Sequence, residues 1–348
     1  MSIDRTAGVK PREDVEMPIR ALVLDQQDRG VEHRVVEFPV DVLPEGDVRV
    51  AVEWSSLNYK DALILAGRGR LVRTYPHVPG IDLAGTVLES ANPDFAPGDR
   101  VILTGWRVGE TWWGGYAEEA RVRSEWLVSC PPGLTLRDAM VFGTAGLTAA
   151  LACLALDDAG ITPHSGSILV TGATGGLGSI AVHLLSRLGY SVTAATSKPE
   201  LERVLRGLGA THVIPRQEIE EAPIKPLLVE RWAGVIDAVG GTTLSHAAAE
   251  VSYGGMVALC GNASGNEFAG NVLPFLLRGI GFTGVDSVMA SLDSRRRAWG
   301  MLAEFADLQA VAAVVHEVGL EDVPGRARAM LEGSSSGRTI VRPREGPS

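Results

Sequence analysis

The sequence predicts an α/β protein in which a doubly wound parallel sheet is inserted into a β-rich domain. Up to about residue 140, short apolar runs are separated by Gly and Pro, which is typical of a mostly β domain. Beyond it, strand-like and helix-like runs alternate, which is typical of a parallel sheet covered by helices. A glycine-rich segment, Gly172 to Gly178, joins the first strand of this second pattern to its first helix.

Length and composition are those of a folded protein of about two domains. The chain has 348 residues, of which 45% are hydrophobic and 21% are charged. A formal net charge of −10 argues against non-specific nucleic-acid binding. The 3 cysteines, Cys130, Cys153 and Cys260, cannot form a disulfide framework. Their odd number, together with no recognisable signal peptide, predicts a cytoplasmic protein.

One uncharged segment, Met140 to Leu156, is close to the minimum length that spans a bilayer. Glycine and threonine dilute its apolar residues, and aspartates flank it. We therefore expect a buried helix here, and no association with a membrane.

The elements of the β-rich part come first in the chain. Residues 1–18 are polar, and we expect a flexible N-terminal extension. Strand-like runs follow at residues 20–24, 48–54, 85–88 and 100–103.

The elements of the second part alternate in type. Strands are expected at residues 167–171, 191–196, 212–214, 234–239 and 255–260, and helices at 177–188, 200–208 and 244–251. A further helix over 293–307 has apolar residues at helical spacing, and the last strand covers 338–341. We infer that this C-terminal segment returns to the first domain, so that the parts are 19–142, 143–287 and 288–348.

The glycine-rich segment predicts a dinucleotide-binding loop. Gly172, Gly175 and Gly178 are spaced for a tight turn and for a close approach of the backbone to a pyrophosphate. The helix that follows offers free N–H groups and the positive end of its dipole. The alternative is a plain glycine-rich turn between strand and helix. The predicted cofactor-binding residues of this loop are Gly172, Thr174, Gly175, Gly176, Leu177 and Gly178.

The end of the next strand favours NADPH over NADH. Sites that bind NAD carry an Asp or Glu about 20 residues after the loop. Here the strand ends in Thr196-Ser197-Lys198, where a hydroxyl and a cation suit a 2′-phosphate. Arg216 closes the following strand and is placed to reach the same phosphate. The alternative is that Lys198 and Arg216 are ordinary surface charges.

Two classes of dehydrogenase do not fit. None of the 5 tyrosines is followed four positions later by lysine, which short-chain dehydrogenases require. The cysteines match no spacing of zinc ligands, and the segment from Pro79 to Gly85 contains no Gly-His-Glu sequence. We therefore predict no catalytic metal.

The chain resembles the zinc-free medium-chain dehydrogenases/reductases over about residues 20–343. The motifs that carry this resemblance are Ser55 to Asp61, Val78 to Gly85, Pro97 to Val101, Gly114 to Glu118 and Gly143 to Thr148. More narrowly, Leu57 to Ala62, Leu103 to Trp106, Ala233 to Asp237 and Gly284 to Met289 resemble the bacterial acrylyl-CoA reductases, which are similar to quinone oxidoreductases. The resemblance implies a GroES-like catalytic domain with an inserted Rossmann domain. It further implies NADPH-dependent reduction of acrylyl-CoA to propionyl-CoA by a cytoplasmic homodimer.

The resemblance and the topology together imply further residues that contact the cofactor. Asn262 follows a late strand at the carboxyl edge of the sheet, beside the nicotinamide. The remaining predicted contacts are Tyr59, Thr148, Gly261, Val285 and Ser287.

The expected reaction needs hydrogen-bond donors for an enolate oxygen and a proton for the α-carbon. Tyr59 is the candidate for either role, with packing against the nicotinamide as the alternative. Asn58 is expected to orient the nicotinamide or the substrate carbonyl. Lys60 is expected to bind a phosphate or to form an ion pair with Asp61 or Asp82.

An acyl-CoA substrate carries several negative charges, so an acidic protein must receive it on local cations. Arg68, Arg70 and Arg338 are the candidates, and Trp113 is a candidate wall of the acyl pocket. The alternatives are solvated surface for each arginine and core packing for Trp113.

Two other functions remain open. A quinone or enone reductase would share the fold, the cofactor and the hydride chemistry, without a site for CoA. A non-catalytic NADPH-binding protein would keep the fold alone.

Overall fold

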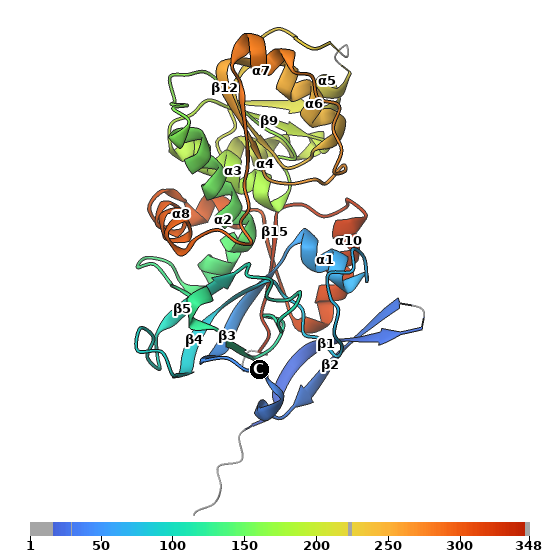
Figure 1. The fold of residues 1–348 in the computed structure, drawn as a ribbon, viewed down its shortest axis with the longest axis vertical. Helices are drawn as coiled ribbons and strands as arrows, with labels where there is room; N and C mark the ends of the chain where they lie inside the picture. The colour runs from blue at the N-terminus through green and yellow to red at the C-terminus, as the bar shows by residue number, and fades with distance from the viewer. Residues whose placement is uncertain (1–16, 29, 222–224, 345–348) are drawn as a thin grey trace, which may run out of the picture.

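The computed structural model describes residues 17–28, 30–221 and 225–344. Most of the predicted N-terminal extension, residues 1–16, lies outside the described residues. The chain forms two lobes, one β-rich and one with a sheet covered by helices, and α1, α2 and β15 lie where the two lobes meet (Figure 1).

The β-rich lobe is built on a mainly antiparallel sheet in the order β14-β15-β3-β4-β5-β7, with β6 paired to β3. Its strands are β3 (Val48–Leu57), β4 (Asp82–Ser90), β5 (Arg100–Thr104), β6 (Glu119–Val122), β7 (Val128–Ser129), β14 (Val315–Val318) and β15 (Arg338–Val341). The hairpin β1 (Ile19–Gln27) and β2 (Gly30–Phe38) packs beside it. The pairing of β15 with β3 brings the C-terminal strand back onto the sheet of the N-terminal segment.

The other lobe contains a fully parallel sheet in the order β10-β9-β8-β11-β12-β13. Its strands are β8 (Ile168–Val170), β9 (Val192–Thr196), β10 (His212–Pro215), β11 (Trp232–Asp237), β12 (Val251–Leu259) and β13 (Gly281–Gly284). The strand order reverses at β8, and this is where doubly wound sheets bind their ligands. The predicted α/β fold, a GroES-like domain with an inserted Rossmann domain, is confirmed.

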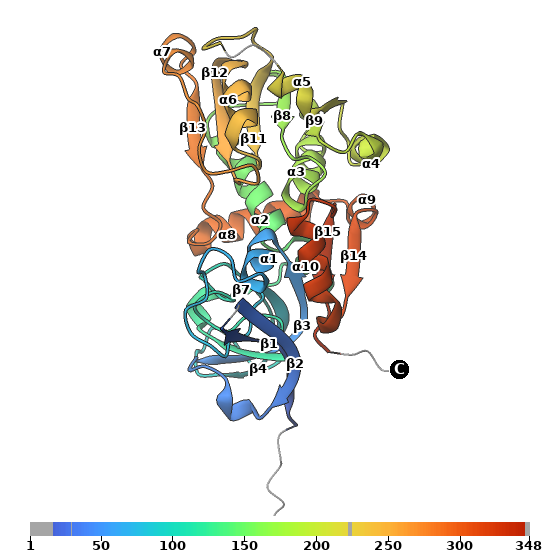
Figure 2. The same cartoon turned by 90° about the vertical axis from the view of Figure 1, so that its right-hand side faces the viewer.

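Helices cover the parallel sheet and connect the lobes (Figures 1 and 2). They are α1 (Tyr59–Leu65), α2 (Leu136–Asp158), α3 (Gly176–Arg187), α4 (Glu202–Gly207), α5 (Arg216–Glu220), α6 (Gly241–Ala249), α7 (Leu273–Arg278), α8 (Leu292–Phe305), α9 (Leu308–Ala312) and α10 (Val323–Leu331).

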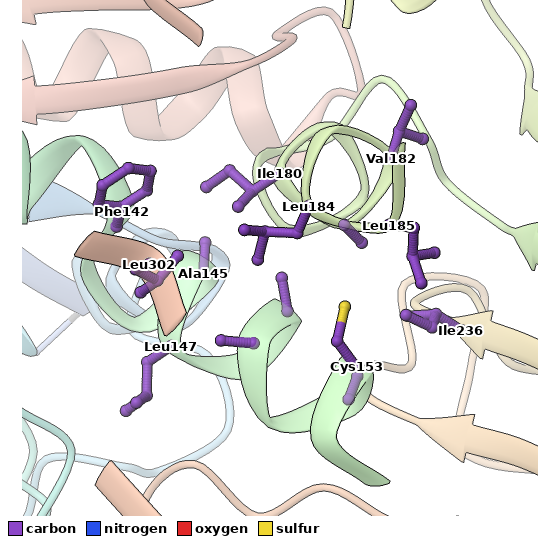
Figure 3. Close-up of a cluster of buried hydrophobic side chains, with 14 of the residues drawn as sticks. Phe142, Ala145, Leu147, Cys153, Ile180, Val182, Leu184, Leu185, Ile236 and Leu302 are labelled. Carbon is purple, nitrogen blue, oxygen red and sulfur yellow. The ribbon is translucent and has the colours of Figure 1, made fainter. Parts of the chain in front are cut away.

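The long helix α2 forms the centre of the core. It packs against α3, and Figure 3 shows Cys153 of α2 facing the side of α3 that carries Leu184 and Leu185. This helix has the length and hydropathy of a membrane span, but 78% of its most apolar window is buried inside the protein. The buried helix predicted from the sequence is therefore present, and burial within the protein accounts for its apolar composition.

Candidate active site

A cavity of about 590 Å³ lies between the lobes, within the range of small-molecule sites. Residues from both lobes line it. The predicted residues that line it are Asn58, Tyr59, Lys60, Thr148, Gly172, Thr174, Gly175, Gly176, Leu177, Gly178, Ser197, Lys198, Arg216, Gly261, Asn262, Val285, Ser287 and Arg338. Thr196, Arg68, Arg70 and Trp113 do not line it.

The glycine loop forms the floor of the cavity between β8 and α3. Gly175 caps α3, and its N–H donates to the carbonyl of Gly172 at 2.9 Å, which closes a tight turn. At Gly178, a Cβ would lie 2.3 Å from the carbonyl oxygen of Gly172, so no side chain fits where the helix leaves the strand. The first N–H groups of α3 therefore face an open cavity, and this arrangement suits a pyrophosphate.

The outer end of the cavity, which we define by Ser197, Lys198, Arg216 and Ser335, carries the cations. Thr196 lies behind it, where its buried hydroxyl contacts Thr174 Oγ1 at 3.0 Å and accepts from the N–H of Lys198 at 3.0 Å. This pair fixes the turn that presents Ser197 and Lys198. Two basic groups beside hydroxyls fit the 2′-phosphate of NADPH.

A C-terminal turn, residues 333–337, closes the outer end from the other lobe. The Gly337 N–H donates to the Thr174 carbonyl at 2.9 Å, and the Lys198 ammonium donates to the Ser335 carbonyl. Ser335 and Ser336 line the cavity. The sequence analysis did not predict this turn as part of the site. The only signal was a short Gly-Ser run, which carries no information about where it folds.

A buried cluster of Asn58, Asp61, Asp82 and Arg338, which we call the inner end, lies where Asn58 and Arg338 line the cavity. Asn58 caps α1, and its N–H donates to Asp61 Oδ2 at 2.9 Å. Its side-chain Nδ2 donates to Asp82 Oδ2 at 2.7 Å, and its Oδ1 accepts from Arg338 Nη1 at 3.1 Å. Asn58 is therefore held by the protein itself, and its contact with the nicotinamide or the substrate stays a prediction.

Asp82 is the centre of the inner end. It accepts from the Ser56 hydroxyl at 2.6 Å and from both the N–H and the hydroxyl of Thr144, at 2.8 and 2.5 Å. The Thr144 contacts depend on a break in α2 at Gly143, where φ is +52°. A Cβ at Gly143 would lie 2.5 Å from Asp82 Oδ2 and 2.6 Å from Ser56 Oγ, so only glycine fits.

Arg338 supplies the positive charge at the inner end. Its guanidinium donates to the Val141 carbonyl at 2.9 Å and to Ser56 Oγ at 2.8 Å, in addition to Asn58. Because each of the three guanidinium nitrogens of this buried side chain has a partner within the protein, the prediction that Arg338 binds a CoA phosphate is wrong. It balances the buried Asp82 and Asp61 instead.

Burial and the neighbouring charges shift the pKa values of Asp61 and Arg338. Burial, and secondarily the Asp82 carboxylate, raises the pKa of Asp61 from 3.8 to about 7. Burial also lowers the pKa of Arg338, while Asp82 and Asp61 act in the opposite direction. The Asp61 carboxyl group therefore takes up a proton near neutral pH.

Tyr59 is the exposed residue next to this buried end. It occupies the first turn of α1, lines the cavity and leaves 43% of its surface exposed. Lys60 forms an ion pair with Glu110 at 2.8 Å, so the predicted partners Asp61 and Asp82 are replaced by Glu110. Tyr59 is thus a partly exposed phenol in the wall of the cavity.

A buried arginine that the sequence analysis missed supports the side of the cavity formed after β13. Arg295 of α8 donates to the Ser287 carbonyl at 2.9 Å and to the Thr104 carbonyl at 2.7 Å. The Ser287 hydroxyl accepts from Thr148 Oγ1 at 2.8 Å. Arg295 therefore ties the segment that carries Val285 and Ser287 to the β-rich lobe.

Three predicted substrate residues lie elsewhere. Trp113 packs edge-on against Phe38, with ring centroids 5.4 Å apart, so its predicted place in the acyl pocket is wrong. Arg70 lies exposed in the loop after α1, outside the cavity, and Arg68 lines a separate groove. Among the described residues, no group of three or more His, Cys, Asp or Glu side chains is arranged to hold a metal ion.

Comparison with known proteins places this geometry among dehydrogenases. A family model described as an alcohol dehydrogenase GroES-like domain matches residues 44–132, and one described as a zinc-binding dehydrogenase matches residues 176–305. Acrylyl-CoA reductase AcuI from Ruegeria pomeroyi is 47% identical over 92% of this chain and 98% of its own length.

Two solved structures are similar over nearly their whole length. The yhdH oxidoreductase of Salmonella enterica, in complex with NADP, has a TM-score of 0.91 and 46% identity, and covers 93% of this chain and 99% of its own. Bacillus subtilis yhfP, with NAD bound, has a TM-score of 0.90 and 40% identity, and covers 94% and 99%. The B. subtilis protein is named a putative quinone oxidoreductase.

Proposed function

We infer that this chain, which belongs to the acrylyl-CoA reductase family of the medium-chain dehydrogenases/reductases, reduces the carbon–carbon double bond of acrylyl-CoA to give propionyl-CoA. The electron donor is NADPH. When bound, NADPH supplies the hydride that is added to the β-carbon of the substrate.

One observation carries this inference. A single cavity joins a nucleotide loop and an outer end with two cations, in one lobe, to the phenol of Tyr59 in the other. Lys198 and Arg216 suit the 2′-phosphate that distinguishes NADPH from NADH, and no carboxylate occupies the end of β9.

The residues of the inner end position the reaction. Tyr59 donates a hydrogen bond to the thioester oxygen as negative charge develops there, or a proton to the α-carbon. Asn58, Asp82 and Arg338 hold the start of α1 fixed, so Tyr59 is presented by a rigid support. The glycine loop holds the pyrophosphate at the centre of the dinucleotide, and the 333–337 turn lies beside the end that carries the 2′-phosphate.

We also propose that the protein is a homodimer in the cytoplasm. Leu276 and Leu277 of α7 are exposed immediately before β13, which lies at the edge of the parallel sheet, and such a face supports pairing with a second copy. Sedimentation at micromolar concentration tests this: a dimer is expected, a monomer for Leu276→Glu with Leu277→Glu, and a monomeric wild type would contradict it.

A quinone reductase is the second candidate, because the B. subtilis relative carries that name at 41% identity. Steady-state rates of NADPH oxidation with acrylyl-CoA, crotonyl-CoA and small quinones separate the two. We expect kcat/KM to be highest for acrylyl-CoA. A quinone preferred by orders of magnitude would overturn the assignment.

A further inference from the structure

Helix α8 carries three consecutive arginines, and the first of them, Arg295, differs from the other two. Arg296 and Arg297 are exposed and form ion pairs with Asp293 and Asp158. Arg295 is only 1% exposed. It is buried because α8 packs against α2 where the two lobes meet, as both views of the fold show (Figures 1 and 2). A buried arginine is costly unless its donors are satisfied, so its partners indicate its role.

The Arg295 guanidinium binds both lobes at once. Towards the parallel sheet, its Nη2 donates to the carbonyls of Ser287 and Val288 at 2.9 and 2.8 Å, and its Nε donates to the Ala290 carbonyl at 3.0 Å. Towards the β-rich lobe, its Nη1 donates to the carbonyl and the hydroxyl of Thr104 at 2.7 and 2.9 Å. These acceptors are all backbone or hydroxyl oxygens, so the guanidinium joins backbone segments rather than balancing an adjacent carboxylate.

Arg295 also supports a strained turn at the end of β5. Gly105, Trp106 and Arg107 have φ values of +77°, +54° and +60°, in the left-handed region. For a side chain as bulky as tryptophan this conformation is unfavourable, and it persists only where surrounding contacts fix it. The Trp106 ring centroid lies 4.9 Å from the Arg295 guanidinium carbon, so this cation is one of the contacts that fix the turn.

The lobes are in direct contact at this turn. The Trp106 N–H donates to the Val288 carbonyl at 2.9 Å. A Cβ at Gly105 would lie 2.7 Å from the same carbonyl oxygen and 2.9 Å from Arg295 Nη2. Because no space separates the two segments, neither can shift without displacing the other.

Both segments that Arg295 joins line the cofactor cavity. The turn after β5 continues to Glu110, which pairs with Lys60 at 2.8 Å, next to Tyr59 in α1. The segment after β13 carries Ser287, a predicted contact of the cofactor. One guanidinium therefore connects the wall expected to touch the nicotinamide with the wall that holds the candidate proton donor.

We propose that Arg295 is a positioning residue for the reduction, because it fixes the 285–288 segment, and with it the nicotinamide ring, relative to Tyr59. This inference rests on the proposed function. Hydride transfer depends steeply on the geometry of donor and acceptor, and a displacement of about 1 Å can lower a rate by about 10²-fold. Arginine suits this role because its planar fork directs donors to several acceptors in fixed directions, whereas lysine offers a single ammonium.

The first test is Arg295→Lys, which keeps the positive charge and loses the fork. In stopped-flow single turnovers with saturating NADPH and acrylyl-CoA, the rate of hydride transfer should fall by about tenfold or more. The Kd for NADPH should change by less than about threefold, because its affinity depends mainly on the phosphate contacts. The matched control is Arg296→Lys, an exposed neighbour in α8, which should leave both values unchanged.

Two results would overturn the positioning role. One is a wild-type rate of hydride transfer in folded Arg295→Lys, even if its thermal stability is lower, since a purely structural arginine gives that result. The other is a raised Kd for NADPH with an unchanged rate, which would make Arg295 a binding residue.

Thr104→Val keeps the test decisive if Arg295→Lys does not fold. It removes one hydroxyl acceptor of the guanidinium and keeps the shape of the side chain. We expect the rate of hydride transfer to fall in the same direction by about threefold, because Nη1 keeps the Thr104 carbonyl as a partner. An unchanged rate in Thr104→Val, with Arg295→Lys unfolded, would refute the proposal.

Hydrogen exchange of the protein without cofactor separates this inference from the proposed function. Arg295→Lys should raise the exchange rate of the Trp106 N–H by about tenfold or more, and Arg296→Lys should not change it. If the wild type reduces quinones but no acrylyl-CoA, the proposed function is refuted, and the same rate measurement with a quinone tests Arg295. Equal exchange of the Trp106 N–H in Arg295→Lys and the wild type refutes the positioning role whatever the substrate.

Discussion

The inner and outer ends of the cavity differ in how their charged side chains are held. At the inner end, Asp61, Asp82 and Arg338 are buried, and each polar atom is held by another part of the chain. At the outer end, Lys198 and Arg216 are partly exposed and make few contacts within the protein. The inner end is organised before any ligand arrives. At the outer end, Lys198 donates to a backbone carbonyl and Arg216 pairs with Glu220 at 3.3 Å, and a ligand phosphate can compete for both cations because they are partly exposed.

Substitutions at the two ends should therefore act on different properties, namely stability at the inner end and cofactor binding at the outer end. Removing a partner at the inner end leaves a charge buried without compensation, and this destabilises the fold. Changing a cation at the outer end costs little stability, because water replaces the missing contact, and acts on the cofactor instead.

The largest effect is expected for Arg338→Ala, which leaves Asp82 and Asp61 without their cation. The free energy of unfolding should fall by about 3–5 kcal/mol, measured by denaturant unfolding. Arg203→Ala, at an exposed position on α4, should change it by less than about 0.5 kcal/mol. If Arg338→Ala were as stable as the wild type, removing a charge at the inner end would cost no more stability than removing one at the outer end, which contradicts the comparison.

A pH effect is also expected from the Asp61 carboxyl group at the inner end. Because the pKa of Asp61 is raised from 3.8 to about 7, the folded protein keeps a proton that the unfolded chain releases. Stability from this group is complete below about pH 4 and is lost as the pH rises through about 7. Asp61→Asn should remove on the order of 4 kcal/mol of this pH dependence. Parallel curves of unfolding free energy against pH in the two proteins would contradict it.

Tyr59 combines features of both ends. Its side chain is partly exposed in the cavity, but its helix α1 begins at the buried inner end. Tyr59→Phe should lower kcat by roughly 10²-fold, with stability and the KM for NADPH nearly unchanged. Stopped-flow NADPH oxidation measures kcat and the KM for NADPH, and thermal unfolding measures the stability. An unchanged kcat means that water or another group supplies the proton.

The smallest effect is expected at the outer end. Lys198→Glu should raise the KM for NADPH by about tenfold and change the KM for NADH little, because the repulsion acts on the 2′-phosphate. Arg203→Glu again serves as the exposed control. Equal effects on the two dinucleotides would refute the assignment of Lys198.

The sequence allowed the fold and the glycine loop to be predicted because both depend on local patterns. Alternating runs and the spacing of Gly172, Gly175 and Gly178 need no knowledge of distant contacts. Arg295 lies on the same helical face as Ala298, Trp299 and Leu302, so the helical spacing of the apolar residues in α8 indicates that its side chain is buried.

The inner end could not be predicted in the same way. Arg338 is 256 positions after Asp82 in sequence (338 − 82), and only the pairing of β15 with β3 brings the strand carrying it into the lobe that contains Asp82. An arginine in isolation is expected at the surface, so it was assigned to a phosphate. Trp113 was misplaced because an aromatic beside glycines fits a pocket wall and a packed core equally well. The 333–337 turn depends on contacts between lobes.

The most direct test of the account is a single isotope experiment with NADPH deuterated at the transferable position of the nicotinamide. Acrylyl-CoA and the enzyme should give propionyl-CoA with one deuterium at the β-carbon, seen by mass spectrometry, and in heavy water one deuterium at the α-carbon. Unlabelled propionyl-CoA, or NADPH consumed with acrylyl-CoA intact, would contradict hydride transfer to this substrate.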